Sequence, residues 1–142
     1  CDLHQGNGTA LIFRGDPRVY TFSIHQDNLY PVKQPSDLDI GLPDFTGDEE
    51  YLGHLERHVP RMLDELHPDL AVYLAGADPF MRDQLGMLAL TFDGLRRRDE
   101  LVIGGCVGRG VPVAVVLAGG YAEDVHDTVR IHVATGHVLA QA

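Results

Sequence analysis

The sequence predicts an α/β domain in which helices flank a parallel β-sheet. Three short runs are rich in Val, Leu, Ile, Tyr and Phe without strict alternation, a pattern typical of strands buried on both faces. Longer segments with apolar residues at helical spacing lie between and after these runs. Strands that alternate with helices indicate a parallel sheet. The 142 residues, 44% of them hydrophobic, suffice for one sizeable core.

The predicted strands occupy residues 19–24, 70–74 and 111–117. Residues 25–46, which follow the first strand, contain three prolines and are expected to form an irregular loop. Loops of this length in compact domains are usually functional or mobile. Asp37 and Asp39, in the motif SDLDIGL within this loop, are expected to lie on a solvent-exposed face.

The first predicted helix begins at a T-x-x-E capping box formed by Thr46 and Glu49. An apolar stripe at helical spacing follows and runs to Leu66. Pro60 lies inside this stripe and is expected to kink or split the helix, because proline removes a backbone donor and crowds the preceding turn.

Two further helices are expected in the second half of the chain. One covers residues 92–106, with Thr91 or Asp93 as its cap, and ends in the glycine-rich run GGCVGRG. The other covers about residues 122–136. Three valines share one face of this last helix: Val125, Val129 and Val133.

Charge and composition narrow the classes of partner. The formal net charge of −10 repels phosphate backbones, so direct nucleic-acid binding is not expected. The same charge favours a cationic partner such as a lysine-rich peptide or a polyamine, or serves solubility alone. The sequence holds no run of about 18 apolar residues that would cross a membrane. Cys1 and Cys106 show no CxxC spacing and are expected to be free thiols, which favours a reducing, cytoplasmic location.

Candidate functional residues cluster where predicted strands end, which is where ligands bind in open α/β sheets. Asp2 and His4 follow the first apparent strand end and, being two residues apart in an extended segment, leave the same face. Asp78 ends another predicted strand, in LAGAD. This mixed nitrogen and oxygen set suits catalytic Zn²⁺ or Fe²⁺. The alternative is that Asp2 only forms a turn and Asp78 only caps the segment before a proline.

Two other predicted strand ends carry further candidate residues. Ser23 and His25 lie at the end of the strand predicted at residues 19–24. The motif LAGGY could cradle a phosphate at a helix N-terminus, or it could form a tight turn that directs Tyr121 into the site.

Taken together, these motifs resemble the histone deacetylase superfamily, in the form of class IV-like and related bacterial deacetylases. The resemblance runs along nearly the whole chain through DLHQGNGTALIF, VYTFSIHQDNLYP, SDLDIGL, LAGADPF, DQLG and VLAGGY. It implies an arginase/deacetylase-like fold, with residues 1–142 forming the C-terminal part of a single catalytic domain whose N-terminal part is missing.

The resemblance also implies roles for individual residues. Three would ligate zinc: Asp2, His4 and Asp78. Tyr121 would hydrogen-bond the substrate carbonyl, and Tyr30 would line the channel that admits the acyl-lysine.

Further residues would support this centre. Asn7 would orient one of the catalytic histidines. A structural potassium ion would be held by the Ser23 side chain and by the backbone of three residues: Asp2, His4 and Ile24.

The implied activity is a metal-dependent amidohydrolase that removes acetyl or other acyl groups from lysine side chains or related amines. The family's paired catalytic histidines lie upstream of the D-x-H motif, and no His-His occurs in these 142 residues. Because a general base contributes about 10²–10⁴ in rate, the chain alone is expected to be inactive. It is alternatively expected to be unstable, because the loss of several strands bares an apolar edge and face. The alternatives are an acetylpolyamine hydrolase and a half-domain that binds a metal or a partner without catalysis.

Overall fold

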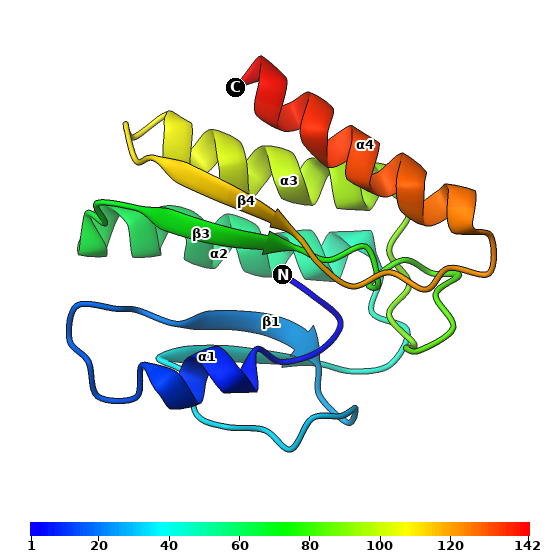
Figure 1. Ribbon diagram of the computed structural model, residues 1–142, viewed down its shortest axis with the longest axis horizontal. Helices are drawn as coiled ribbons and strands as arrows, with labels where there is room; N and C mark the ends of the chain where they lie inside the picture. The colour runs from blue at the N-terminus through cyan, green and yellow to red at the C-terminus, as the bar shows by residue number, and fades with distance from the viewer.

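Four helices and four strands make up the computed structural model, which describes residues 1–142 (Figure 1). No helix combines the length and the apolar character needed to cross a membrane. The elements in chain order are α1 (Asn7–Ile12), β1 (Phe22–Gln26), β2 (Leu38–Leu42), α2 (Asp48–Leu66), β3 (Ala71–Ala75), α3 (Phe92–Val107), β4 (Val113–Leu117) and α4 (Val125–Gln141).

The strands form two parallel pairs instead of one continuous sheet. β1 pairs with β2, and β3 pairs with β4. The opening segment of the chain passes between the two pairs (Figure 1). The carbonyl of Cys1 accepts a hydrogen bond from the N–H of Gly76 at 3.0 Å, and the carbonyl of Leu3 accepts one from Gln26 at 3.0 Å. Residues 1–3 therefore join the carboxyl ends of β1 and β3.

Helices cover one face of the β3–β4 pair. α2 and α3 lie behind this pair, and α4 packs on α3 (Figure 1). Along β3, Tyr73 and Ala75 point into the core, whereas Val72 and Leu74 are exposed on the other face. Apolar side chains from α2, α3 and the strands form one buried cluster. Only one face of this sheet is thus packed within residues 1–142.

The expected α/β class and parallel pairing are confirmed, with changes at the strand ends. The strand expected at residues 19–24 begins at Phe22 and continues to Gln26. Consequently Ser23 and His25 lie within β1 and do not follow it. The segment with Asp2 and His4 is not a regular strand, although its backbone bonds to both neighbouring strands.

Residues 25–46 were expected to form an irregular loop, which was wrong for the part that forms β2. The acids Asp37 and Asp39 are exposed as expected, but both have structural partners. Asp37 accepts from the backbone and hydroxyl of Thr21, and Asp39 accepts from the side chain of Gln5 at 2.8 Å. The acid pair therefore fastens β2 to neighbouring segments.

Two expectations for α2 were wrong, the capping box and a split of the helix at Pro60. Gly47 is the N-cap, and the hydroxyl of Thr46 donates to the carbonyl of Pro43, so no capping box forms. Pro60 sits inside one uninterrupted helix and does not split it. A single missing backbone donor is tolerated here because Val59 and Leu63 on either side are buried in the core.

The other two helices begin at side-chain caps. Thr91 accepts from the N–H of Gly94 at 3.0 Å, which confirms it as the cap of α3. The last helix starts at Val125, three residues later than expected, because Asp124 caps it. The valine face expected on this helix is solvent-exposed, and Ile131 and Thr135 form its buried side.

Candidate metal centre

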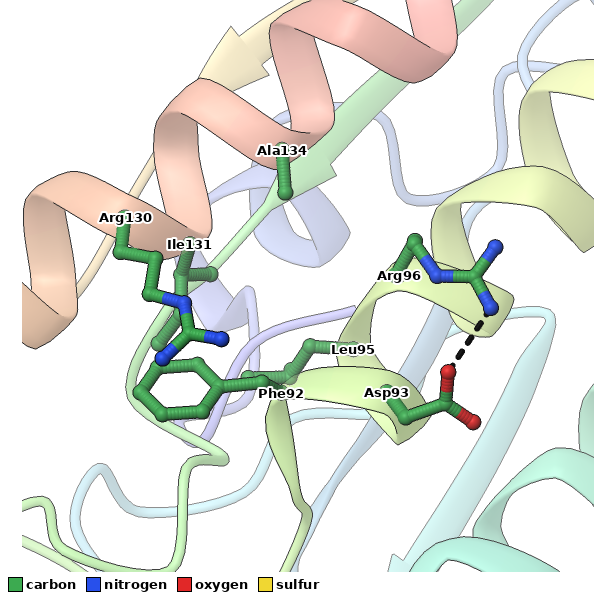
Figure 2. A pocket seen from close by; sticks show the side chains of 7 residues that line it. All are labelled: Phe92, Asp93, Leu95, Arg96, Arg130, Ile131 and Ala134. Atoms are coloured by element: carbon green, nitrogen blue, oxygen red, sulfur yellow. Dashed lines mark hydrogen bonds and ion pairs between the residues drawn. The ribbon is translucent and has the colours of Figure 1, made fainter.

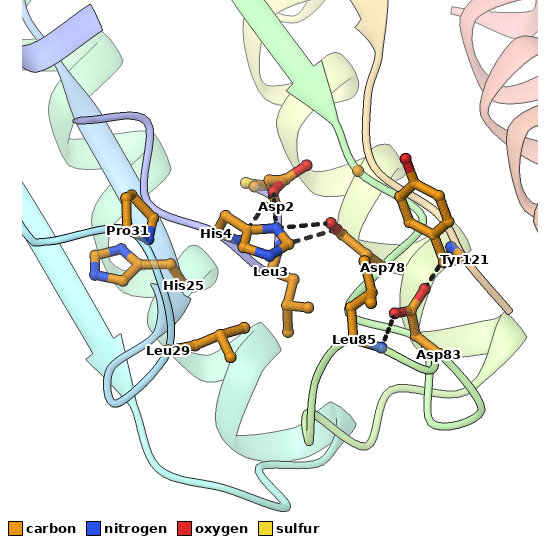
Figure 3. A network of polar contacts seen from close by, with 12 residues as sticks. Asp2, Leu3, His4, His25, Leu29, Pro31, Asp78, Asp83, Leu85 and Tyr121 are labelled. Atoms are coloured by element: carbon orange, nitrogen blue, oxygen red, sulfur yellow. Dashed lines mark hydrogen bonds and ion pairs between the residues drawn. The ribbon is translucent and has the colours of Figure 1, made fainter. Parts of the chain in front are cut away.

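Asp2, His4 and Asp78 converge at the carboxyl ends of β1 and β3 (Figure 3). One ligand atom from each residue lies within 4.8 Å of the others. The Nδ1 atom of His4 is 3.2 Å from Oδ2 of Asp78 and 3.5 Å from Oδ1 of Asp2. These residues were expected together from their strand-end positions, and the structure brings all three together.

The backbone around Leu3 sets this geometry. The side chain of Leu3 is fully buried, which turns its neighbours Asp2 and His4 toward the opposite side. The N–H of Leu3 donates to Oδ1 of Asp78 at 2.9 Å, and the N–H of His4 donates to Oδ1 of Asp2 at 2.9 Å. A backbone donor therefore fixes one oxygen of each carboxylate, and Oδ2 of Asp78 points toward the ring of His4.

Two glycines allow the backbone to approach these carboxylates. A Cβ at Gly76 would lie 2.5 Å from Oδ2 of Asp2 and 2.7 Å from Oδ1 of Asp78. A Cβ at Gly119 would lie 1.9 Å from Oδ2 of Asp78. All three distances are far below van der Waals contact, so side chains at these positions would displace the carboxylates.

The electrostatics of the cluster favour a bound cation. Burial, and then the neighbouring carboxylate of Asp2, raise the pKa of Asp78 to about 6. A divalent cation reverses this effect because it stabilises the ionised carboxylates. Two carboxylates and one imidazole, cradled by glycines, fit Zn²⁺ or Fe²⁺.

Tyr121 lies on the far side of Asp78 from His4 (Figure 3). Its N–H donates to Oδ2 of Asp83 at 2.6 Å, and its carbonyl accepts from both the backbone and side-chain amides of Gln84, each at 3.1 Å. The side chain itself is exposed. The segment that follows Asp78 thus holds the Tyr121 backbone on both its donor and acceptor sides.

Tyr30 borders the cluster on the His4 side. Its ring centroid is 6.5 Å from that of His4, and the two rings are tilted by 69°. Tyr30 is 79% exposed, so it is largely open to solvent beside His4.

Ser23 and Ile24 are buried in β1, beside the opening segment. The hydroxyl of Ser23 is 2.9 Å from Nδ1 of His25, and burial lowers the pKa of this histidine. Asn7 is partly buried at the start of α1, and its N–H donates to the carbonyl of Gln5 at 2.8 Å.

The sequence analysis gave no role at the site to Asp83 or Gln84, and it considered Gly119 only as part of the turn in LAGGY. The motif DQLG that contains the first two was a usable signal, because two polar residues precede a glycine shortly after a ligand. A separate pocket between α3 and α4, lined by Phe92, Arg130 and neighbouring side chains, shares no residue with this cluster (Figure 2).

Comparison with known proteins gives one consistent result. The sequence profile of the histone deacetylase domain matches residues 1–136. An uncharacterised protein of Picosynechococcus is 49% identical over 132 residues, which is 92% of this chain and 44% of that protein. Histone deacetylase 2 of Arabidopsis thaliana is 31% identical over 126 residues, covering 86% of this chain and 33% of that protein.

A solved structure agrees with the sequence matches. The crystal structure of the HDA15 HD domain superposes with a TM-score of 0.81 at 26% identity, covering 99% of this chain and 44% of that one. The chain therefore spans less than half the length of the proteins it matches, and the domain described here is partial.

Proposed function

The chain belongs to the histone deacetylase family, and on this premise we propose that the complete protein is a metal-dependent amidohydrolase. It removes acetyl or other acyl groups from lysine side chains or related amines. The observation that carries the proposal is the convergence of Asp2, His4 and Asp78 from two distant segments. Residues 1–142 are assigned as the C-terminal part of a single catalytic domain.

Asp2, His4 and Asp78 would hold the ion, with Zn²⁺ preferred and Fe²⁺ compatible with the same donors. When bound, such an ion polarises the acyl carbonyl and lowers the pKa of bound water. We assign K⁺ a structural role beside Ser23, with backbone contributions from Asp2, His4 and Ile24. The junction of β1 with the opening segment, through the bond between Leu3 and Gln26, supports this assignment.

Tyr121 is assigned the role of hydrogen-bond donor to the carbonyl oxygen as negative charge develops on it. A donor of this kind contributes roughly 10²–10³ in rate. The hydrogen bonds of the Tyr121 backbone with Asp83 and Gln84 support the assignment, because a fixed backbone limits the positions that the hydroxyl can reach. Tyr30 is assigned to the wall of the acyl-lysine channel, in keeping with its exposed ring beside His4.

Proton transfer is assigned to histidines outside residues 1–142, one of them oriented by Asn7. Within the chain, His4 belongs to the ligand set. His25 is buried and bonded to Ser23, which leaves it no access to a substrate. A general base that takes a proton from the attacking water, and then returns one to the leaving amine, typically contributes about 10²–10⁴ in rate.

The substrate is assigned as an acylated lysine in a peptide or protein, or an acylated small amine. The net charge of −10 supports a cationic substrate and argues against direct nucleic-acid binding. The two cysteines are unpaired, which supports a reducing, cytoplasmic location.

Release of acetate by the complete protein tests this function. An acetylated lysine peptide and an acetylated polyamine are supplied in parallel, so that the preferred amine is read from the ratio of kcat/KM. Turnover of either substrate that is lost in the Asp78→Asn variant supports the amidohydrolase. No turnover of either substrate by a protein that binds zinc favours the non-catalytic alternative.

A further inference from the structure

Arg98 on α3 is a fully buried arginine directed at the two backbone segments that carry the metal ligands. Its Nη1 atom donates to the carbonyl of Gly76 at 2.5 Å and to the carbonyl of Cys1 at 3.4 Å. Gly76 lies two residues before Asp78, and Cys1 is adjacent to Asp2. One guanidinium therefore bridges both ligand-bearing segments from behind.

The guanidinium is itself fixed by a buried carboxylate. Nε of Arg98 donates to Oδ1 of Asp99 at 2.9 Å. That carboxylate also accepts from the hydroxyl of Tyr73 at 2.5 Å and from the hydroxyl of Thr135 at 2.6 Å. All four side chains are at most 5% exposed. The Nη2 atom of Arg98 lies 2.8 Å from the same oxygen of Asp99 as an ion pair but has no hydrogen bond of its own. Buried polar networks rigidify the groups that they connect.

The network ties four parts of the fold to one point. Tyr73 belongs to β3, Arg98 and Asp99 to α3, and Thr135 to α4, while the carbonyl of Cys1 belongs to the opening segment. The carbonyl of Cys1 also accepts from the N–H of Gly76, so the backbone on both sides of this contact is held. A buried ion pair costs desolvation free energy, and replacing both charges by neutral groups is often tolerated. Stability alone is therefore a weak explanation for this pair.

We infer that Arg98 is a positioning residue for the metal centre, which sets the separation between Asp2 and Asp78 by bridging the carbonyls of Cys1 and Gly76. The inference rests on the proposed metal site. Partners that orient metal ligands typically contribute 10–100-fold in metal affinity. The consequence is a defect in metal binding that is distinct from any loss of folding stability.

Metal affinity of the complete protein tests this role. Zinc dissociation constants are measured by competition with a chelator, and visible absorption of the cobalt-substituted protein reports ligand geometry. The Arg98→Met/Asp99→Asn double variant removes both buried charges and keeps an acceptor for Tyr73. We expect its zinc dissociation constant to rise about 10–100-fold, with an altered cobalt spectrum. Arg98→Lys keeps the charge but loses the planar guanidinium. Its zinc dissociation constant is expected to lie between those of the unsubstituted protein and the double variant.

Arg97→Met is the matched control, because Arg97 is the preceding residue on α3 and is exposed. It is expected to bind zinc as the unsubstituted protein does. A folded double variant that binds zinc as tightly as Arg97→Met, with an unchanged cobalt spectrum, would overturn the inference alone. If the unsubstituted protein binds neither zinc nor cobalt, both the proposed function and this inference fail. If the double variant does not fold, Arg98→Lys decides between these outcomes.

Discussion

The carboxylate of Asp83 accepts a 2.6 Å hydrogen bond from the backbone N–H of Tyr121. The two residues are 38 positions apart, and Asp83 lies five residues after the ligand Asp78. An isolated antiparallel bridge between Asp83 and Ala122 continues the contact. The position of Tyr121 is thereby coupled to the segment that carries a metal ligand.

Replacing Asp83 by alanine is expected to lower kcat of the complete protein more than it changes KM. The Tyr121 backbone loses its acceptor, and a displacement of about 1 Å at a reacting group can cost 10²-fold in rate. Steady-state kinetics on an acetyl-lysine peptide measure the effect. Asp83→Asn keeps an acceptor oxygen and is expected to retain most activity. Equal loss in both variants would contradict a role through this hydrogen bond.

The Tyr121→Phe variant isolates the hydroxyl. Removing one donor to a developing oxyanion is expected to lower kcat by roughly 10²–10³. Zinc affinity is expected to stay unchanged, because Tyr121 is not among the clustered ligands. Parallel measurement of kcat and of zinc binding checks both parts. Full activity in this variant would remove Tyr121 from the catalytic assignment.

Gly119→Ala is expected to weaken metal binding. The added Cβ would lie 1.9 Å from Oδ2 of Asp78 and must displace that carboxylate. Gly136→Ala provides the control, since nothing lies within 4 Å of its Cβ and it sits inside α4. That change is expected to stabilise the protein by about 0.5–1 kcal/mol. Zinc titration and urea unfolding of both variants measure these effects, and unaltered zinc affinity in Gly119→Ala would refute the steric argument.

Asp78→Asn separates metal binding from folding. The pKa of Asp78 is raised from 3.8 to about 6, so the ionised carboxylate is unfavourable in the metal-free folded state above that pH. In the presence of a chelator at neutral pH, the variant is therefore expected to be as stable as the unsubstituted protein or more so. Added zinc should raise Tm of the unsubstituted protein only. A zinc-dependent Tm increase in Asp78→Asn would show that the ligand set is wrong.

His25 is expected to make the protein acid-sensitive. Burial lowers the pKa of His25 below its usual 6.5, with a smaller contribution from Lys33, so the folded protein binds this proton less readily than the unfolded chain. The associated stability is present above pH 6.5 and is lost as the pH falls below that value. Urea unfolding at about pH 7.5 and pH 5.5 measures the loss. His25→Asn is expected to reduce this change in the free energy of unfolding between the two pH values. An unchanged difference would assign the acid sensitivity to other groups.

The helices and strands that could be predicted were those whose own residues show a recognisable pattern. β3 and β4 stand out because their side chains are apolar over the whole strand, and α3 because a threonine caps an amphipathic run. β2 was missed because prolines flank it closely and its second residue, Asp39, is exposed. Such a strand looks like a loop until its partner β1 is known.

At the site, too, motifs within a short stretch of sequence could be predicted, whereas contacts between distant residues could not. The i, i+2 spacing of Asp2 and His4 and the strand-end position of Asp78 are visible in the sequence. The support from Arg98 is not visible there, because it acts on backbone groups 22 and 97 residues away. Asp83 lies in the motif DQLG, but its contact with the backbone of Tyr121, 38 residues away, is not visible either. Contacts of this kind depend on how the strands and helices pack, and no motif records them.

The metal content of the complete protein tests the central claim most directly. The protein is purified without added metal or chelator and subjected to elemental analysis beside an acetate-release assay. We expect about one zinc or iron per chain, lost in Asp78→Asn together with turnover. Turnover that persists in a protein free of divalent transition metal, or in Asp78→Asn, would contradict the account.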